Sequence, residues 1–211
     1  SMAEVEEVQK HLSQLNAQTE KTAQLSFLKG IDHLLLQDLG AAISALTEAI
    51  ERDPSFTLAY FARSIASLRR SEAERGRPAE QSTPSTPQVR AAATGAKATT
   101  PAELPLTAPA PTRVIEYSPL TDLNQVITQA PTFAFAYYNR ANLYAKTGDV
   151  ERAKQDYTKA IELNPLFAES YFNRGLLYYS EGKVKEGTRD LSRAGELGLY
   201  KAYSLIKRMN K

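Results

Sequence analysis

The chain has 211 residues, of which 42% are hydrophobic and 24% charged, the proportions of an ordinary globular protein. Its 26 Lys and Arg residues nearly balance 24 Asp and Glu residues and are spread along the chain, so we expect no basic surface for nucleic acid. The absence of cysteine excludes disulfides, thiolate metal ligands and thiol nucleophiles. This composition fits the cytoplasm and the periplasm equally, and localisation stays open.

Catalytic and membrane signals are also missing. The two histidines, His11 and His33, stand in no metal-binding or catalytic-triad pattern, and no glycine-rich phosphate loop occurs. No apolar run approaches the ~20 residues of a membrane span. We therefore expect no catalytic residue, no metal, no cofactor and no membrane span.

Residues 1–22 predict an amphipathic helix. Val5, Val8, Leu12 and Leu15 follow one another at spacings of three, four and three residues, which gives a narrow apolar stripe. Such a helix would either cap the fold or pair with another copy of the chain, and in the second case the chain would be a homodimer.

From residue 23 onward the chain repeats itself at intervals of about 34 residues, a period typical of helix-turn-helix repeats. The clearest match sets residues 134–165 on the stretch that follows, where Tyr137 aligns with Tyr171, Arg140 with Arg174 and Gly148 with Gly182. We divide the chain into units at 23–56, 57–133, 134–167 and 168–200, with a capping helix at 201–211.

The second unit, 57–133, is interrupted. A first helix is expected from Thr57 to about Arg70, followed by a proline-rich insertion at about 72–114 that we expect to be disordered. The missing second helix reappears in residues 122–133, which align with 156–167. The insertion would be either a tolerated loop or a modification or docking segment.

A charged pair tests this register. Arg140 and Asp156 are 16 residues apart, as are Arg174 and Asp190, and Arg63 and Asp122 are 59 apart. Removing an insertion of about 43 residues restores the same spacing of 16. We therefore predict that Arg63 and Asp122 close the interrupted unit with the same pair, with bidentate geometry where the helices allow it.

These units resemble the tetratricopeptide-repeat (TPR) family, which has aromatic, small and glycine residues at fixed places in each helix pair. Unit 134–167 fills its positions with Tyr137, Ala141, Tyr144, Gly148, Ala153, Tyr157, Ala160 and Pro165. The first unit departs from the pattern at Ser26, His33 and Gln37. The resemblance implies an all-α, right-handed superhelix of antiparallel helix pairs that binds another protein and has no catalytic activity.

The first helix of each unit is expected to line a concave groove that binds a peptide or an amphipathic helix. The residues one step off the core face are Phe27, Ile31, Phe61, Ile65, Tyr138, Asn142, Phe172, Asn173, Leu176 and Tyr179. This row is more aromatic than charged, which favours an apolar peptide or helix.

Three alternatives accompany this interpretation. Family members that clamp a C-terminal carboxylate use Lys and Asn, but Phe27 and Ile31 stand in those places in one frame, and Tyr138 and Tyr203 replace the lysines in another. The chain could instead be a self-assembly module, or the regulatory segment of a larger protein.

Overall fold

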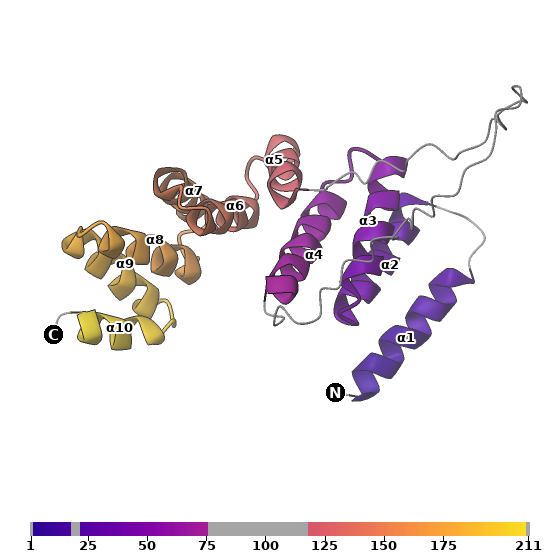
Figure 1. The fold of residues 1–211 in the computed structure, drawn as a ribbon, viewed down its shortest axis with the longest axis horizontal. Coiled ribbons are helices and arrows are strands. Elements are labelled where there is room, and N and C mark those ends of the chain that lie inside the picture. Colours follow the sequence, from indigo (N-terminus) through magenta and orange to yellow (C-terminus); the bar gives the residue numbers. More distant parts are fainter. Residues whose placement is uncertain (1, 18–21, 76–117, 210–211) are drawn as a thin grey trace, which may run out of the picture.

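The computed structural model describes residues 2–17, 22–75 and 118–209, and all regular structure in those residues is helical. Figure 1 shows the helices following one another along an elongated array. Their bounds are α1 Met2–Asn16, α2 Ala23–Leu35, α3 Leu39–Arg52, α4 Thr57–Arg75, α5 Pro119–Gln129, α6 Ala134–Lys146, α7 Val150–Leu163, α8 Ala168–Ser180, α9 Val184–Glu196 and α10 Lys201–Met209.

The array is built from antiparallel helix pairs. Helix α2 packs on α3, α4 on α5, α6 on α7 and α8 on α9, and the second helix of each pair also contacts the first helix of the next. The result is an all-α solenoid, a right-handed superhelix of paired helices, as the sequence predicts. None of the helices in the described ranges is long and apolar enough to cross a membrane.

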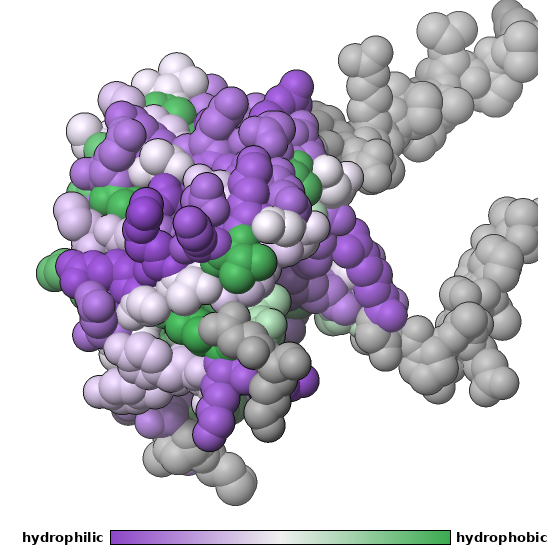
Figure 2. Space-filling model, turned by 90° about the vertical axis from the view of Figure 1, so that its left-hand side faces the viewer, coloured by the Kyte–Doolittle hydropathy of each residue, from purple (hydrophilic) through white to green (hydrophobic). Residues whose placement is uncertain are grey.

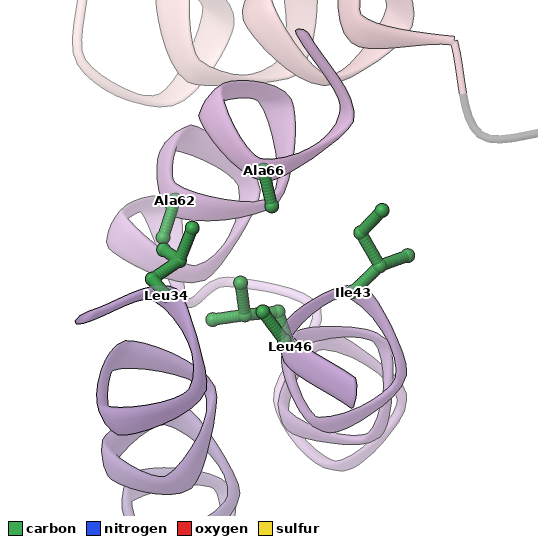
Figure 3. Packing of buried hydrophobic residues seen from close by; sticks show 6 residues of the cluster. Leu34, Ile43, Leu46, Ala62 and Ala66 are labelled. Carbon is green, nitrogen blue, oxygen red and sulfur yellow. The ribbon is translucent and has the colours of Figure 1, made fainter. Parts of the chain in front are cut away.

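The core lies where three successive helices meet. Figure 3 shows Leu34 from α2, Leu46 from α3 and Ala62 from α4 converging on one cluster. Leu46 is fully buried, and a Cβ atom on Gly30 would lie only 2.5 Å from its Cγ atom. The close approach of α2 and α3 therefore requires glycine at position 30.

The turns inside the pairs share one backbone conformation. Gly148 and Gly182 adopt positive φ angles of 82° and 74°, and Gln37 adopts 61° at the corresponding turn of the first pair. A residue with a Cβ atom in this region costs about 1–2 kcal/mol. The first unit keeps the turn although it lacks the glycine of the family pattern.

The predicted charged pair is confirmed. Arg63 donates from Nε and Nη2 to the two carboxylate oxygens of Asp122, at 2.9 and 2.7 Å. Arg140 with Asp156 and Arg174 with Asp190 form the same bidentate pair, at 2.7–2.9 Å.

Each of these arginines also reaches the preceding pair. The Nη1 atom of Arg63 donates to Thr47 at 3.1 Å. In the same way, Nη1 of Arg140 donates to Asn124 and Nη1 of Arg174 donates to Thr158, both at 2.8 Å. One guanidinium therefore joins three helices, because its five donors form a planar fork.

The expected end of the first helix in the interrupted unit was wrong. Helix α4 continues to Arg75, into the range assigned to the insertion. Glu72 and Glu74 on this last stretch form ion pairs with Lys146 and Arg70, and residues 71–75 contain no proline or glycine that would end a helix. The rest of the expected insertion, 76–114, lies outside the described residues, and the division into units remains our interpretation.

The end helices pack on their neighbours. Helix α1 packs on α2, where Leu15 is buried and the His11 Nδ1 and Asp32 Oδ2 atoms lie 2.7 Å apart. Helix α10 packs on α9, and its buried Ala202 joins Leu191 and Ala194 in a common cluster.

Candidate peptide groove

A pocket of about 350 Å³ lies between α4 and α6, the first helices of two successive units. We call it the α4–α6 pocket. Two of its lining residues, Glu72 and Lys146, form an ion pair between α4 and α6, with a distance of 2.6 Å between Oε1 and Nζ. Its lining residues are Ile65, Leu68, Arg69, Glu72, Asn139, Asn142, Leu143 and Lys146.

Asn142 is the best-positioned polar group of this pocket. Its Oδ1 atom accepts a hydrogen bond of 2.5 Å from the Tyr157 hydroxyl and one of 3.0 Å from Nδ2 of Asn173. Burial raises the pKa of Tyr157, so the phenol stays protonated and continues to donate. These two bonds hold the amide oxygen of Asn142, and its amide N–H groups keep the capacity to donate.

Asn139 lies one helical turn away and complements Asn142. Its Nδ2 atom donates to the carbonyl oxygen of Phe135 at 2.7 Å, which leaves the Oδ1 atom as an acceptor. The α4–α6 pocket is therefore lined by two amide side chains, one with remaining donor capacity and one with remaining acceptor capacity, together with the apolar side chains of Ile65, Leu68 and Leu143. A peptide main chain carries both complementary groups.

All ten groove residues that the sequence predicts are half-buried in the structure. Ile65 and Asn142 line the α4–α6 pocket, and Asn173 is joined to it through Asn142. The others lie on the same first helices but outside this pocket: Phe27, Ile31, Phe61, Tyr138, Phe172, Leu176 and Tyr179.

Several of these aromatic side chains pack between helices. Phe27 contacts Phe56 with ring centroids 4.8 Å apart, Phe61 meets Phe133 edge-on at 5.0 Å, and Tyr138 contacts Phe167 at 4.7 Å. Such pairs stabilise the joints between helices in addition to any role in the groove.

The C-terminal end of the predicted row lies against the chain's own helices. Lys201 of α10 places Nζ 4.6 Å from the ring centroid of Phe172. Tyr179 lies against Gly187 and shares a hydrogen bond of 2.5 Å with Thr188, both on α9. The ten residues therefore do not form one uninterrupted free surface.

Sequence reasoning missed six of the pocket residues. Leu68 and Glu72 lie one and two turns beyond Ile65, and Asn139 and Lys146 flank Asn142 at three and four residues. Helical spacing from the two predicted residues would have found them. Glu72 was missed because the expected first helix ended at about Arg70, and the others were missed because too few residues per turn were selected.

An ion cluster ties the third unit to the fourth. Lys154 is buried and its Nζ atom lies 2.7 Å from carboxylate oxygens of Glu151 and of Glu181. Burial opposes the charge on Lys154, but the two carboxylates outweigh burial and raise its pKa. Hydrogen bonds from Lys154 and then Lys183 lower the pKa of Glu181 to about 2.

Glu181→Gln is expected to flatten the acid dependence of folding stability. Because the folded-state pKa of Glu181 is depressed, its contribution is present above about pH 4.5 and is lost as pH falls toward about 2. Urea unfolding followed by circular dichroism from pH 7 to pH 2 measures this. Glu169→Gln, at an exposed site on α8, is the control, and equal pH profiles for both variants would show that Glu181 is uncoupled.

No group of three or more His, Asp or Glu side chains that could hold a metal ion occurs within the described ranges.

Comparison with protein families gives three matches, each to a model described as a tetratricopeptide repeat. They cover residues 27–88, 134–167 and 156–187. Among curated proteins, no sequence is significantly similar to this chain.

Solved structures share the fold. MamA 41-end from Desulfovibrio magneticus RS-1 is 16% identical, with a TM-score of 0.64 over 90% of this chain and 85% of that one. YrrB, described as a TPR protein with an unusual peptide-binding site, is 11% identical, with a TM-score of 0.64 over 98% and 87%. The first TPR of Spaghetti (RPAP3), bound to the HSP90 peptide SRMEEVD, is 16% identical, with a TM-score of 0.53 over 76% and 94%.

Antiparallel helix pairs, a bidentate Arg–Asp pair repeated in three units, and turns with a positive φ angle together define a helical-repeat solenoid. The chain belongs to the tetratricopeptide-repeat family.

Proposed function

We propose that this chain is a non-catalytic protein-interaction scaffold that binds an apolar peptide segment of a partner along its first helices, centred on the α4–α6 pocket. The observation that carries the proposal is the composition of this pocket. Apolar Ile65, Leu68 and Leu143 stand beside the fixed amides of Asn139 and Asn142. That combination suits a main chain and one apolar side chain at the same time.

Two further observations support a peptide over a small polar ligand. The α4 side of the pocket runs from Ile65 to Glu72, about two helical turns, which is the extent of a short peptide segment rather than of a small molecule. Two solved structures with the same fold, YrrB and the first TPR of Spaghetti, are described respectively as having a peptide-binding site and as bound to a peptide. The Glu72–Lys146 ion pair is half-exposed and would adjust to an entering segment at small energetic cost.

Ile65→Glu is expected to weaken peptide binding by about tenfold or more, because it places a carboxylate against the apolar side of the pocket. Peptides would first be selected from a random display library on the immobilised chain. The enriched peptide is then titrated calorimetrically against wild type and variant.

Leu58→Glu is the matched control. Leu58 also lies on α4 and is 53% exposed, but it lies outside the pocket. The proposal requires wild-type affinity for Leu58→Glu. Equal losses in the two variants, or no loss in either, would place binding elsewhere.

A further inference from the structure

Helix α1 has the sequence and the position of a second helix. Its stripe of Val5, Val8, Leu12 and Leu15 stands 34 residues before Leu39, Ala42, Leu46 and Ala49 of α3, which is the second helix of the first pair. The packing agrees, because α1 contacts α2 as α3 contacts α4. Helix α1 is therefore equivalent to the second half of a repeat.

Helix α10 has the pattern of a first helix. Ala202, Ser204 and Arg208 stand 34 residues after Ala168, Ser170 and Arg174 of α8. It packs on α9 as α8 packs on α7. Arg208 also stands at the repeat position of Arg63, Arg140 and Arg174, the arginines that pair with aspartates in the earlier units. Helix α10 is therefore equivalent to the first half of a repeat.

The N-terminal end of the array has a slot for a helix of that kind. Within the array a first helix lies against its own second helix and against the next first helix, as α4 does with α5 and α6. The two corresponding helices at the N-terminal end are α1 and α2, and a pocket of about 760 Å³ lies between them. We call it the N-terminal slot; its lining residues are Glu4, Val5, Glu7, Val8, Lys10, His11, Gln14, Asp32, Leu35 and Leu36.

Apolar side chains are exposed around this slot. Leu35 is 61% exposed and Val5 45%, and both line it. Leu28, 43% exposed, lies two turns before Leu35 on the same face of α2. At the corresponding positions of α6, polar Asn139 and Lys146 face α4. The α2 face is thus more apolar than the equivalent face inside the array, which favours a covering helix.

The charges of the two ends are complementary. Helix α1 carries Glu4, Glu6 and Glu7 against the single Lys10 among the described residues, and Glu4 and Glu7 line the slot. The exposed side chains of α10 include Lys201, Lys207 and Arg208, and α10 has no acidic residue.

Figure 2 shows the C-terminal end of the molecule, whose surface is mostly hydrophilic with separate hydrophobic residues. The described residues of this end that could meet a partner therefore include many polar side chains, among them the cations of α10.

We propose that α10 of one copy docks in the N-terminal slot of a second copy, so that α10 and α1 complete one repeat across two chains. Figure 1 places α1 and α10 at opposite ends of the array, so the contact forms between copies. The interface is head-to-tail and joins two different surfaces, which gives chains of copies instead of a closed dimer.

One detail of the composite repeat differs from the repeats inside the chain. The residue of α1 that corresponds to the pairing aspartates is His11, which is bonded to Asp32. Glu7, one turn earlier on the same face, is the carboxylate that would meet Arg208. The proposal therefore predicts an Arg208–Glu7 ion pair between copies.

Sedimentation velocity of the 211-residue chain over a range of protein and salt concentrations tests this. The expected result is a mass that rises with concentration past that of a dimer and falls with added salt. A monomer up to the solubility limit, or a mass that stops at a dimer, would overturn the head-to-tail arrangement.

Charge reversals identify the surfaces. Glu4→Lys with Glu7→Lys, and separately Lys207→Glu with Arg208→Glu, should each lower the association constant by about tenfold or more. The mixture of the two variants should associate again, because the reversed charges are complementary. Failure of the mixture to associate, with both variants folded by circular dichroism, would contradict the proposed pairing.

An uncharged matched pair separates apolar docking from folding. Leu35→Asp changes an exposed side chain inside the slot, whereas Leu166→Asp changes a leucine that is 70% exposed in the turn before α8. Association should be lost only with Leu35→Asp. Equal association of both variants with wild type would show that the slot is not the docking surface.

Discussion

Asp122→Ala is expected to destabilise the fold by about 3–5 kcal/mol, because it leaves the guanidinium of Arg63 buried without its main counter-charge. The side chains of Arg63 and Asp122 are only 6% and 3% exposed. They also join α4 to α5, two helices separated along the chain by residues 76–118. Hydrogen exchange of the α5 amides, with urea unfolding of the whole chain, measures the loss.

Asp156→Ala is the matched control for Asp122→Ala. It removes the same pair from the next unit, where Arg140 and Asp156 are 20% and 9% exposed, so the loss should be smaller, at about 1.5–3 kcal/mol. The double variant Arg63→Leu with Asp122→Leu should be more stable than Asp122→Ala alone, since it removes both charges. If Asp122→Ala and Asp156→Ala lowered the free energy of unfolding equally, burial of the pair would not determine the size of the loss.

Tyr157→Ala is the second change with a large expected effect, a loss of about 3–5 kcal/mol from a large cavity. The side chain is 2% exposed and packs against Ala141 and Ala153 between α6 and α7. Thermal unfolding measures the loss. A variant within about 1 kcal/mol of wild type would mean that the third unit collapses around the missing ring.

Tyr157→Phe separates packing from positioning. It keeps the ring but removes the hydrogen bond that fixes Asn142 in the α4–α6 pocket, at a stability cost of about 0.5–1.5 kcal/mol. The selected peptide should bind this variant more weakly although the fold is intact. Unchanged affinity would show that the orientation of Asn142 is not used.

The repeats were predictable because their signals are local and periodic. The 34-residue period gave the helix pairs, and the recurring distance between Arg and Asp located the partner of Arg63 across a long intervening segment. The pair could be located in this way because a buried guanidinium requires a carboxylate opposite it.

The site was harder to predict because it depends on which half-buried side chains already pack against other parts of the chain. Phe172 and Tyr179 fit the groove pattern, but α9 and α10 supply partners for them, and no period predicts such contacts. Asn139 was not among the predicted groove residues, although it lines the pocket one helical turn before Asn142. The length of α4 was misjudged because the residues that extend it, 71–75, are small, polar or charged and include no large apolar side chain that would mark a buried face.

Hydrogen–deuterium exchange with and without a selected peptide tests the central claim most directly. If the first helices form the binding surface, the bound peptide slows exchange in the second half of α4 and in α6, around Ile65, Glu72 and Asn142. The amides of α3, α5 and α7, the second helices of their pairs, should exchange as fast as they do without peptide. Protection confined to α3, α5 and α7, or to α10, would contradict binding at the α4–α6 pocket.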